Sequence, residues 1–277
     1  MRTNKIFAAL SILFLASCGC GNGTNNNGQG SNTIPDNPNP APPAITYSVI
    51  KAYPHDTSSY TEGLFWQNNA LYESTGNYGN SQLRRNNLLT GQPDKMIKLG
   101  KEFFGEGISL INNKLYQLTY KEKKVFVYDA NTFSKIKELE WTTGEGWGMT
   151  HNDTELIISN GSSNLYFVDP ETFRVKRITG VTDNNGPLTY LNELEYVNGS
   201  VYANIWQTNT IVKIDLVTGK VIGKMDMAGL LDKNGTPKPD EWYQDGNVLN
   251  GIAYDATKNS FYITGKDWPA VFEIKLN

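Results

Sequence analysis

Four short segments of this chain carry residue types that can move protons or stabilise charge. Three are acidic turns, Phe-Gly-Glu-Gly-Ile at 104–108, Gly-Glu-Gly-Trp-Gly at 144–148 and Leu-Asn-Glu-Leu-Glu at 191–195, and the fourth is Thr-Gly-Lys-Asp-Trp-Pro at 264–269. A carboxylate held among aromatic rings, as Glu106 would be beside Phe104, loses solvation, and its pKa rises toward the range useful for proton transfer. A plain turn glutamate is the alternative reading of any one segment. Because such turns recur along the chain, we favour a functional site over unrelated turn residues.

Composition excludes several classes of function. The chain has 277 residues and a formal net charge of −3, and it contains no cluster of Lys or Arg that would suggest nucleic acid. The two histidines, His55 and His151, are far apart in sequence, and we expect both to be loop residues. The chain therefore has few of the His and Cys ligands that a zinc site usually needs, and we expect neither a metal ion nor another cofactor.

The N-terminus has the pattern of a targeting segment. A short basic start is followed by an apolar run at 6–15 that is too short to span a bilayer. Leu-Ala-Ser-Cys at 15–18 resembles a bacterial lipobox, in which Cys18 would be lipidated and become the mature N-terminus; an ordinary cleaved signal peptide is the alternative. The sequence thus predicts a signal peptide at 1–17 and a lipid anchor that holds the protein on a membrane of the bacterial cell envelope, facing the periplasm or the outer membrane.

Residues 18–44 are predicted to form a tether. Gly, Asn and Pro dominate this stretch, and almost nothing in it could pack into a core. Cys20 lies within it, so the domain predicted at 45–277 contains no cysteine and has no disulfide or thiol chemistry.

From residue 45 onward, short alternating or apolar strands follow one another with turn signals between them. Strands are expected at 46–52, 71–74, 114–119, 124–128, 155–159, 164–168, 200–205, 210–215, 260–264 and 270–276. They recur in units of about 40–50 residues that start near Glu62, Glu106, Trp147, Glu193 and Asn250. A four-stranded unit of this length is typical of a propeller blade, so the sequence predicts an all-β, five-bladed β-propeller.

The ends of the chain fit a closed ring. The last unit has only three strands, and the strand at 45–52 has no unit of its own, so it is expected to complete the fifth blade beside residues 271–276 and leave no exposed edge. Residues 225–248 exceed a normal connector and are expected to form a loop across one face. A β-sandwich is the alternative fold, but it does not explain the repeated turns.

In a propeller, the innermost strands all start at the same end of the central channel. The turns that bear Glu62, Glu106, Trp147 and Asn192 should therefore face one another, and Tyr120, Trp206 and Lys266 should reach the same rim. Such a pocket holds carboxylates, an amide, indole N–H donors and an ammonium, but no paired Ser and His and no Gly-rich phosphate loop. That inventory suits proton transfer and oxyanion stabilisation without a covalent intermediate.

The same residues carry a family resemblance. Tyr-Thr-Glu-Gly-Leu at 60–64, Phe-Gly-Glu-Gly-Ile at 104–108 and Gly-Trp-Gly at 146–148 resemble the plant and bacterial type of glutaminyl cyclotransferase. So do Leu-Asn-Glu-Leu-Glu-Tyr at 191–196 with Ala-Asn-Ile-Trp-Gln-Thr at 203–208, Val-Leu-Asn-Gly-Ile-Ala-Tyr at 248–254 and Thr-Gly-Lys-Asp-Trp-Pro at 264–269. The resemblance covers the whole folded part. It implies a five-bladed propeller that converts an N-terminal glutamine to pyroglutamate and releases ammonia.

By that resemblance, Glu106 would transfer the proton, with Trp147, Asn192, Trp206 and Lys266 around the substrate. We expect Asn192 and one or both indoles of Trp147 and Trp206 to stabilise an oxyanion, and Lys266 to orient Glu106 or oppose it electrostatically. Glu62, Phe104 and Tyr120 are expected to complete the substrate pocket. Glu62 stands where plant members carry Gln, and Tyr120 stands where Trp is commoner. The expected partners are peptides with an N-terminal glutamine, and we expect a monomer that binds no nucleic acid. Two other classes stay open, a non-catalytic propeller that binds peptide or sugar and a lactonase-like propeller with calcium on its axis.

Overall fold

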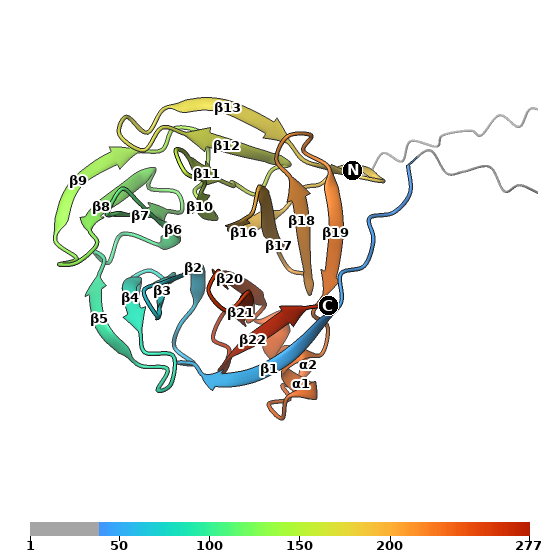
Figure 1. Cartoon of the computed structure of the whole chain (residues 1–277). Coiled ribbons are helices and arrows are strands. Elements are labelled where there is room, and N and C mark those ends of the chain that lie inside the picture. Colours follow the sequence, from blue (N-terminus) through green and yellow to red (C-terminus); the bar gives the residue numbers. More distant parts are fainter. Residues whose placement is uncertain (1–38) are drawn as a thin grey trace, which may run out of the picture. The chain divides into compact units, whose positions relative to one another are not determined.

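The computed structural model describes residues 39–277, which form five four-stranded antiparallel sheets around a central axis (Figure 1). The predicted all-β, five-bladed propeller is confirmed. The predicted signal peptide, Cys18 and most of the tether lie outside the described residues. Within residues 39–277, no helix combines the length and the apolar character needed to cross a membrane.

Four blades follow chain order from the axis outward. The first is β2 (Thr61–Gln67), β3 (Ala70–Thr75), β4 (Gln82–Asn86) and β5 (Pro93–Lys98), and the second is β6 (Gly105–Ile111), β7 (Lys114–Thr119), β8 (Lys124–Asp129) and β9 (Lys135–Glu140). The third is β10 (Met149–His151), β11 (Leu156–Ile158), β12 (Asn164–Val168) and β13 (Val175–Gly180), and the fourth is β16 (Leu191–Val197), β17 (Ser200–Ile205), β18 (Thr210–Asp215) and β19 (Val221–Asp226). Inner strands are buried almost throughout, whereas the outer β5 alternates between half-buried and exposed residues.

The fifth blade closes the ring. It contains β20 (Leu249–Asp255), β21 (Ser260–Gly265), β22 (Ala270–Leu276) and, outermost, β1 (Tyr47–Pro54) from the other end of the chain. β1 pairs antiparallel with β22 from Tyr47 opposite Leu276 to Pro54 opposite Ala270, as the sequence predicted. The blade thus joins the two ends of the propeller through backbone hydrogen bonds and leaves β22 without a free edge.

The apolar core lies between neighbouring blades. One hydrophobic cluster, for example, joins Ile157 and Leu165 of the third blade to Leu194 and Val201 of the fourth. Each sheet buries both faces because it is packed between two others, which explains the near-continuous apolar runs of the inner strands.

Four inner strands begin with a β-bulge. The pairing register shifts between Thr61 and Gly63 in β2, and corresponding shifts occur near the start of β6, β16 and β20. A bulge places an extra residue in one strand and re-aims a side chain. The glycines after Glu62 and Glu106 allow the inner strands to touch, because a Cβ on Gly63 would lie 2.6 Å from the Ile108 nitrogen and one on Gly107 would lie 2.4 Å from the Met149 nitrogen.

Three local expectations need correction. Residues 225–248 are not only loop, because they contain two short helices, α1 (Leu230–Lys233) and α2 (Asp240–Gln244). A small hairpin of β14 (Thr182–Asp183) and β15 (Gly186–Pro187) was not predicted. His151 is the last residue of β10 and not a loop residue.

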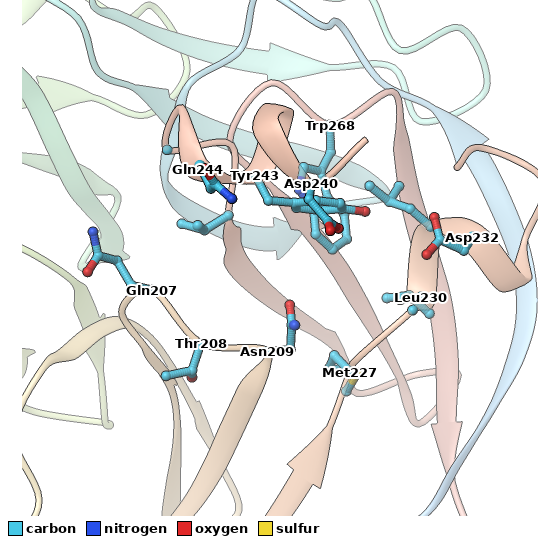
Figure 2. Close-up of a pocket in the computed structure, with 14 residues that line it drawn as sticks. Gln207, Thr208, Asn209, Met227, Leu230, Asp232, Asp240, Tyr243, Gln244 and Trp268 are labelled. Carbon is cyan, nitrogen blue, oxygen red and sulfur yellow. The ribbon is translucent and has the colours of Figure 1, made fainter. Parts of the chain in front are cut away.

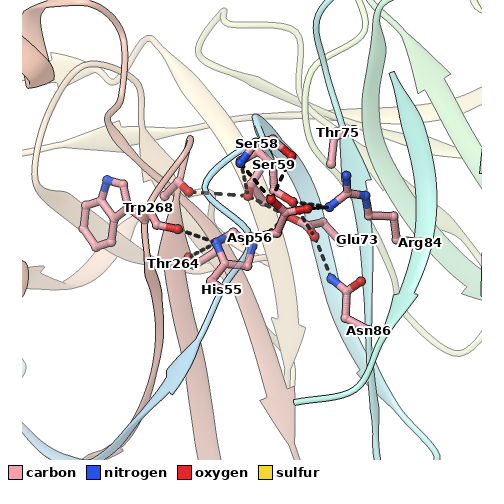
Figure 3. Close-up of polar contacts among 12 residues, drawn as sticks. His55, Asp56, Ser58, Ser59, Glu73, Thr75, Arg84, Asn86, Thr264 and Trp268 are labelled. Atoms are coloured by element: carbon pink, nitrogen blue, oxygen red, sulfur yellow. Dashed lines mark hydrogen bonds and ion pairs between the residues drawn. The ribbon is translucent and has the colours of Figure 1, made fainter. Parts of the chain in front are cut away.

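His55 does lie in a loop, but it is more than a turn neighbour. It is buried, and its ring contacts Glu73 and the carbonyl oxygen of Trp268 (Figure 3). Trp268 belongs to the fifth blade and Glu73 to the first, so His55 links the two blades between which the ring closes.

Candidate active site

A small cavity of about 180 Å³ lies where the inner strands of the blades begin. The residues that line it are Tyr60, Glu62, Phe104, Glu106, Tyr120, Trp147, Asn192, Trp206 and Lys266. All eight residues that the sequence placed in a pocket are therefore brought together, and Tyr60 is added to them. The volume of this cavity is below the range of drug-sized pockets, and it suits a single amino-acid residue.

Two kinds of position supply the polar groups. Glu62, Glu106 and Asn192 are each the second residue of an inner strand, in β2, β6 and β16, where the bulge occurs. Tyr120, Trp206 and Lys266 directly follow β7, β17 and β21, the second strand of their blades. Antiparallel neighbours bring the start of one strand beside the end of the next, which places both sets at one end of the channel.

Lys266 and Glu62 form a buried ion pair. The Lys266 Nζ donates to Glu62 Oε1 at 2.7 Å, and the two side chains are 5% and 4% exposed. Asn250 Nδ2 donates to the other Glu62 oxygen at 3.3 Å, and Lys266 Nζ also lies 4.6 Å from the centre of the Tyr60 ring. Burial alone lowers the pKa of Lys266, but Glu62, Tyr60 and Glu106 outweigh it and raise that pKa above its usual value, so the ammonium stays charged.

Glu106 has no such partner. It is 5% exposed, and among residues 39–277 no group donates a hydrogen bond to either of its carboxylate oxygens. Burial raises the pKa of Glu106 well above its usual value, the Glu62 carboxylate raises it further, and Lys266 opposes both. The Lys266 ammonium thus lies near two carboxylates, those of Glu62 and Glu106, but it donates its hydrogen bond to Glu62. Glu106 is left as a strong base that is aimed into the cavity with its oxygens free.

Aromatic rings form the wall beside Glu106. The Phe104 ring packs edge-on against Tyr60 with 6.2 Å between ring centroids, and it lies 5.8 Å from the Tyr120 ring. These rings keep water from the carboxylates and offer an apolar surface to the carbon chain of a substrate.

Three donors were predicted to stabilise an oxyanion, and the structure distinguishes among them. The indole nitrogen of Trp147 donates to Glu145 Oε2 at 3.1 Å, so this N–H is already engaged. The Trp206 indole, 5.5 Å from the Trp147 ring, and the Asn192 amide make no side-chain hydrogen bond within the described part of the chain. Asn192 is also only 3% exposed. Asn192 and Trp206 are therefore the donors that a substrate oxygen can use.

Comparison with known proteins gives a consistent result. The family model described as glutamine cyclotransferase matches residues 23–276. The chain belongs to the glutamine cyclotransferase family. A curated relative, the glutaminyl-peptide cyclotransferase of Arabidopsis thaliana, is 37% identical over 229 residues, which is 82% of this chain and 70% of that protein. The crystal structure of Myxococcus xanthus glutaminyl cyclase matches with a TM-score of 0.76 and 34% identity, covering 85% of this chain and 98% of that chain.

In this cyclotransferase family member, Tyr60 is the site residue that sequence reasoning missed. A signal for it existed, because Tyr60 precedes Glu62 by two positions and residues two apart in an extended segment lie on the same face. Within residues 39–277, no group of three or more His, Cys, Asp or Glu side chains is arranged to hold a metal ion.

Proposed function

We propose that this protein is a glutaminyl-peptide cyclotransferase. The α-amine of an N-terminal glutamine attacks its own γ-carbonyl carbon, a pyroglutamate ring forms, and ammonia leaves. The observation that carries the proposal is Glu106, a buried carboxylate with free oxygens and a raised pKa in a cavity the size of one residue. Membership of the glutamine cyclotransferase family supports it independently.

The first task of the cavity is to fold the substrate. A free glutamine side chain samples many conformers, and few bring its amine to its γ-carbon. A narrow aromatic cavity that admits only the bent conformer converts that search into a pre-organised reaction, which can contribute several kcal/mol.

Glu106 is proposed to carry the proton. An α-amine has a pKa of about 7.7–8.0, so a base of moderate strength can take its proton as the carbon–nitrogen bond forms. Because the pKa of Glu106 is raised, its carboxylate is a stronger base than an exposed glutamate. The same group then returns the proton to the γ-amide nitrogen, which leaves as ammonia when the tetrahedral intermediate collapses. The number of protons on Glu106 is unchanged after one turnover.

Asn192 and Trp206 are proposed to stabilise the oxyanion that forms on the γ-carbon. A pre-organised donor of this kind is worth about 2.7–4 kcal/mol. Lys266 acts through Glu62 and through the field at Glu106, while Tyr60, Phe104, Tyr120 and Trp147 shape the cavity. We propose that no metal ion takes part, because side chains of this chain can supply every proton and every donor.

The proposal is tested by incubating the protein with a glutamine-initiated peptide in EDTA and following ammonia and peptide mass. Wild type should release one ammonia per peptide, and Glu106→Gln should release almost none while it keeps the circular dichroism spectrum of the wild type. Binding of the peptide without ammonia would support the non-catalytic propeller, and activity that EDTA abolishes would support a metal-dependent enzyme.

We also propose that Cys18 carries a lipid anchor and that residues 18–44 tether the propeller at 45–277 to a membrane of the cell envelope. The lipobox-like Leu-Ala-Ser-Cys segment supports this, as does the Gly, Asn and Pro composition of the stretch after it. Radiolabelled palmitate fed to expressing cells should enter the wild type and the matched control Cys20→Ser but not Cys18→Ser. Equal labelling of Cys18→Ser would exclude the anchor.

A further inference from the structure

A second cavity, of about 480 Å³, is larger than the candidate active site. Figure 2 shows the residues that line it. It is bounded on one side by Gln207, Thr208 and Asn209, which follow β17. On the other sides it is bounded by Trp268 and by parts of the segment 227–248 that contain α1 and α2. None of these residues is assigned a part in the cyclisation above.

The two cavities are neighbours at three points of the structure. Trp206 of the active site is followed directly by Gln207 of the larger cavity. Gly246 lies against Tyr60, since a Cβ on Gly246 would be 3.1 Å from the Tyr60 hydroxyl oxygen. The Lys266 backbone nitrogen donates to the Val248 carbonyl oxygen at 2.9 Å. The two cavities thus lie side by side, and a chain that leaves the active site can enter the larger cavity within a residue or two, at about 3.3–3.6 Å per residue.

The lining suits an extended peptide. Met227, Leu230, Leu231 and Trp268 are buried and give an apolar floor. Gln207, Asn209 and Gln244 are exposed, and their side-chain amides make no hydrogen bond with any other residue of 39–277 (Figure 2). Free amides above an apolar floor can pair with the N–H and C=O groups of a bound backbone, while the floor accepts its side chains.

The charge of the cavity is negative. Asp232 and Asp240 line it, are exposed and form no ion pair within the described residues, whereas no lysine or arginine lines it. Burial raises the pKa of Tyr243, and the charges of both aspartates raise it further, which places the two carboxylates near its hydroxyl.

The cations nearest in sequence do not neutralise these aspartates. Lys233 Nζ donates to the Ala228 carbonyl oxygen at 3.0 Å, and Lys238 Nζ lies 5.3 Å from the centre of the Trp242 ring. The segment 225–248 as a whole contains five carboxylates against two lysines.

We infer that this cavity binds the residues that follow the N-terminal glutamine of a peptide substrate, and that it favours lysine or arginine at the second to fourth positions. The inference rests on the proposed cyclotransferase function. The aliphatic stem of such a side chain would lie on the Met227 and Leu230 floor while its cationic head faces Asp232 and Asp240. Substrate choice is then made by the α1–α2 segment and cyclisation by the neighbouring cavity.

The test compares kcat/KM for the tetrapeptide Gln-Ala-Ala-Ala and for its variants with lysine or glutamate at the second, third or fourth position. Glutamine α-amide, which has no following residue, is measured alongside. Wild type should prefer the lysine peptide over the alanine peptide by about threefold to tenfold at one or more positions, and the glutamate peptide should be poorest. The preference should shrink in high salt.

The variant Asp232→Asn/Asp240→Asn should lose the ratio between the lysine and alanine peptides. The matched control is Asp245→Asn. Asp245 is also exposed and lies in the same segment, but it does not line the cavity, so the ratio of this variant should be that of wild type. Thermal melting of all three proteins establishes that each is folded.

Equal kcat/KM for lysine and alanine peptides in wild type, or a preference that survives in the double variant, would overturn the inference and leave the cyclotransferase proposal intact. Failure of the proposed function looks different, because then neither glutamine α-amide nor any peptide releases ammonia from folded wild type, and the inference fails with it.

Discussion

Two buried glutamates of this propeller have opposite surroundings. Glu73, in β3, accepts hydrogen bonds from Thr61 and Asn86 at 2.7 Å and from His55 at 3.0 Å (Figure 3). Burial alone would raise its pKa, but His55, the nearby Arg84 and Thr61 hold that pKa below its usual value. Glu106, in β6, has no hydrogen bond from any described residue, and its pKa is raised well above its usual value.

His55 explains how Glu73 is held. Its Nδ1 lies 2.7 Å from the Trp268 carbonyl oxygen and its Nε2 lies 3.0 Å from Glu73 Oε1. A carbonyl and an ionised carboxylate can only accept, so both ring nitrogens carry hydrogen and His55 is an imidazolium. Burial opposes that charge, but Glu73 outweighs it and raises the pKa of His55. The charged His55–Glu73 pair therefore lies between the fifth and first blades, where the propeller closes.

The difference between the two glutamates shows what each is for. A buried carboxylate whose oxygens are all satisfied stabilises the fold, because its partners compensate the cost of desolvation. A buried carboxylate whose oxygens are free costs stability and keeps those oxygens for a substrate. Five experiments can test this division, and they follow in order of expected effect.

Glu106→Gln should lower kcat/KM by about 10²–10⁴-fold, the usual contribution of general acid–base catalysis. Since Glu106 accepts no hydrogen bond, the free energy of unfolding at pH 7 should stay the same or rise. Ammonia release and urea denaturation measure the two quantities. Near-normal activity in the folded variant would remove Glu106 from its proposed role.

Glu73→Gln should lower the free energy of unfolding by about 3–5 kcal/mol, because it leaves the buried His55 imidazolium without its anion. Activity per folded molecule should change little, since Glu73 does not line the cavity. Urea denaturation and active-site titration measure these. A variant as stable as wild type would show that the network does not stabilise the fold.

Trp206→Phe should lower kcat by about 10²-fold, and Trp147→Phe should lower it less. Both changes remove an indole N–H and a similar apolar area, but only the Trp206 N–H is free, whereas that of Trp147 is bonded to Glu145. The two variants control for each other in a steady-state assay. Equal losses would mean that shape and not the free donor matters.

The two glutamates should also give opposite pH dependences of stability. The pKa of Glu73 is lowered in the folded state, so its stabilisation is present above the unfolded value of 4.5 and is lost as pH falls through the folded pKa. The pKa of Glu106 is raised, so the folded protein binds the extra proton and loses stability as pH rises from 4.5 through the folded pKa.

Unfolding free energies of wild type, Glu73→Gln and Glu106→Gln across pH 3–8 measure this. The unfolding free energy of wild type should exceed that of Glu73→Gln by less below pH 4.5 than above it. The unfolding free energy of Glu106→Gln should exceed that of wild type by more as the pH rises above 4.5. Parallel curves for all three proteins would contradict the assignment.

Glu62→Gln should shift the acidic limb of kcat/KM to lower pH. The Glu62 carboxylate raises the pKa of Glu106, and without it Lys266 is free to face Glu106 and lower that pKa further. A pH profile with glutamine α-amide, which avoids the larger cavity, measures the shift. A limb that stays in place would indicate that another group sets it.

The sequence alone determined the architecture and most of the residues that line the cavity. Repeats of about 40–50 residues specify a propeller, and a propeller brings the starts of its inner strands to one place, so Glu62, Glu106, Trp147 and Asn192 could be assembled without coordinates. The closing strand also followed, because the last repeat lacked one strand and the first strand lacked a repeat.

Only the tertiary structure decided which buried groups are satisfied. Lys266 and Glu62 are 204 positions apart and His55 and Trp268 are 213 apart, so neither contact leaves a local pattern in the sequence. His55 looked like a turn neighbour, and the indoles of Trp147 and Trp206 looked equivalent. A hydrogen bond depends on angstrom-scale placement of two atoms, whereas a repeat depends only on residue type and spacing. The fold therefore follows from residue type and spacing, whereas the chemistry of Glu106 follows from the placement of individual atoms.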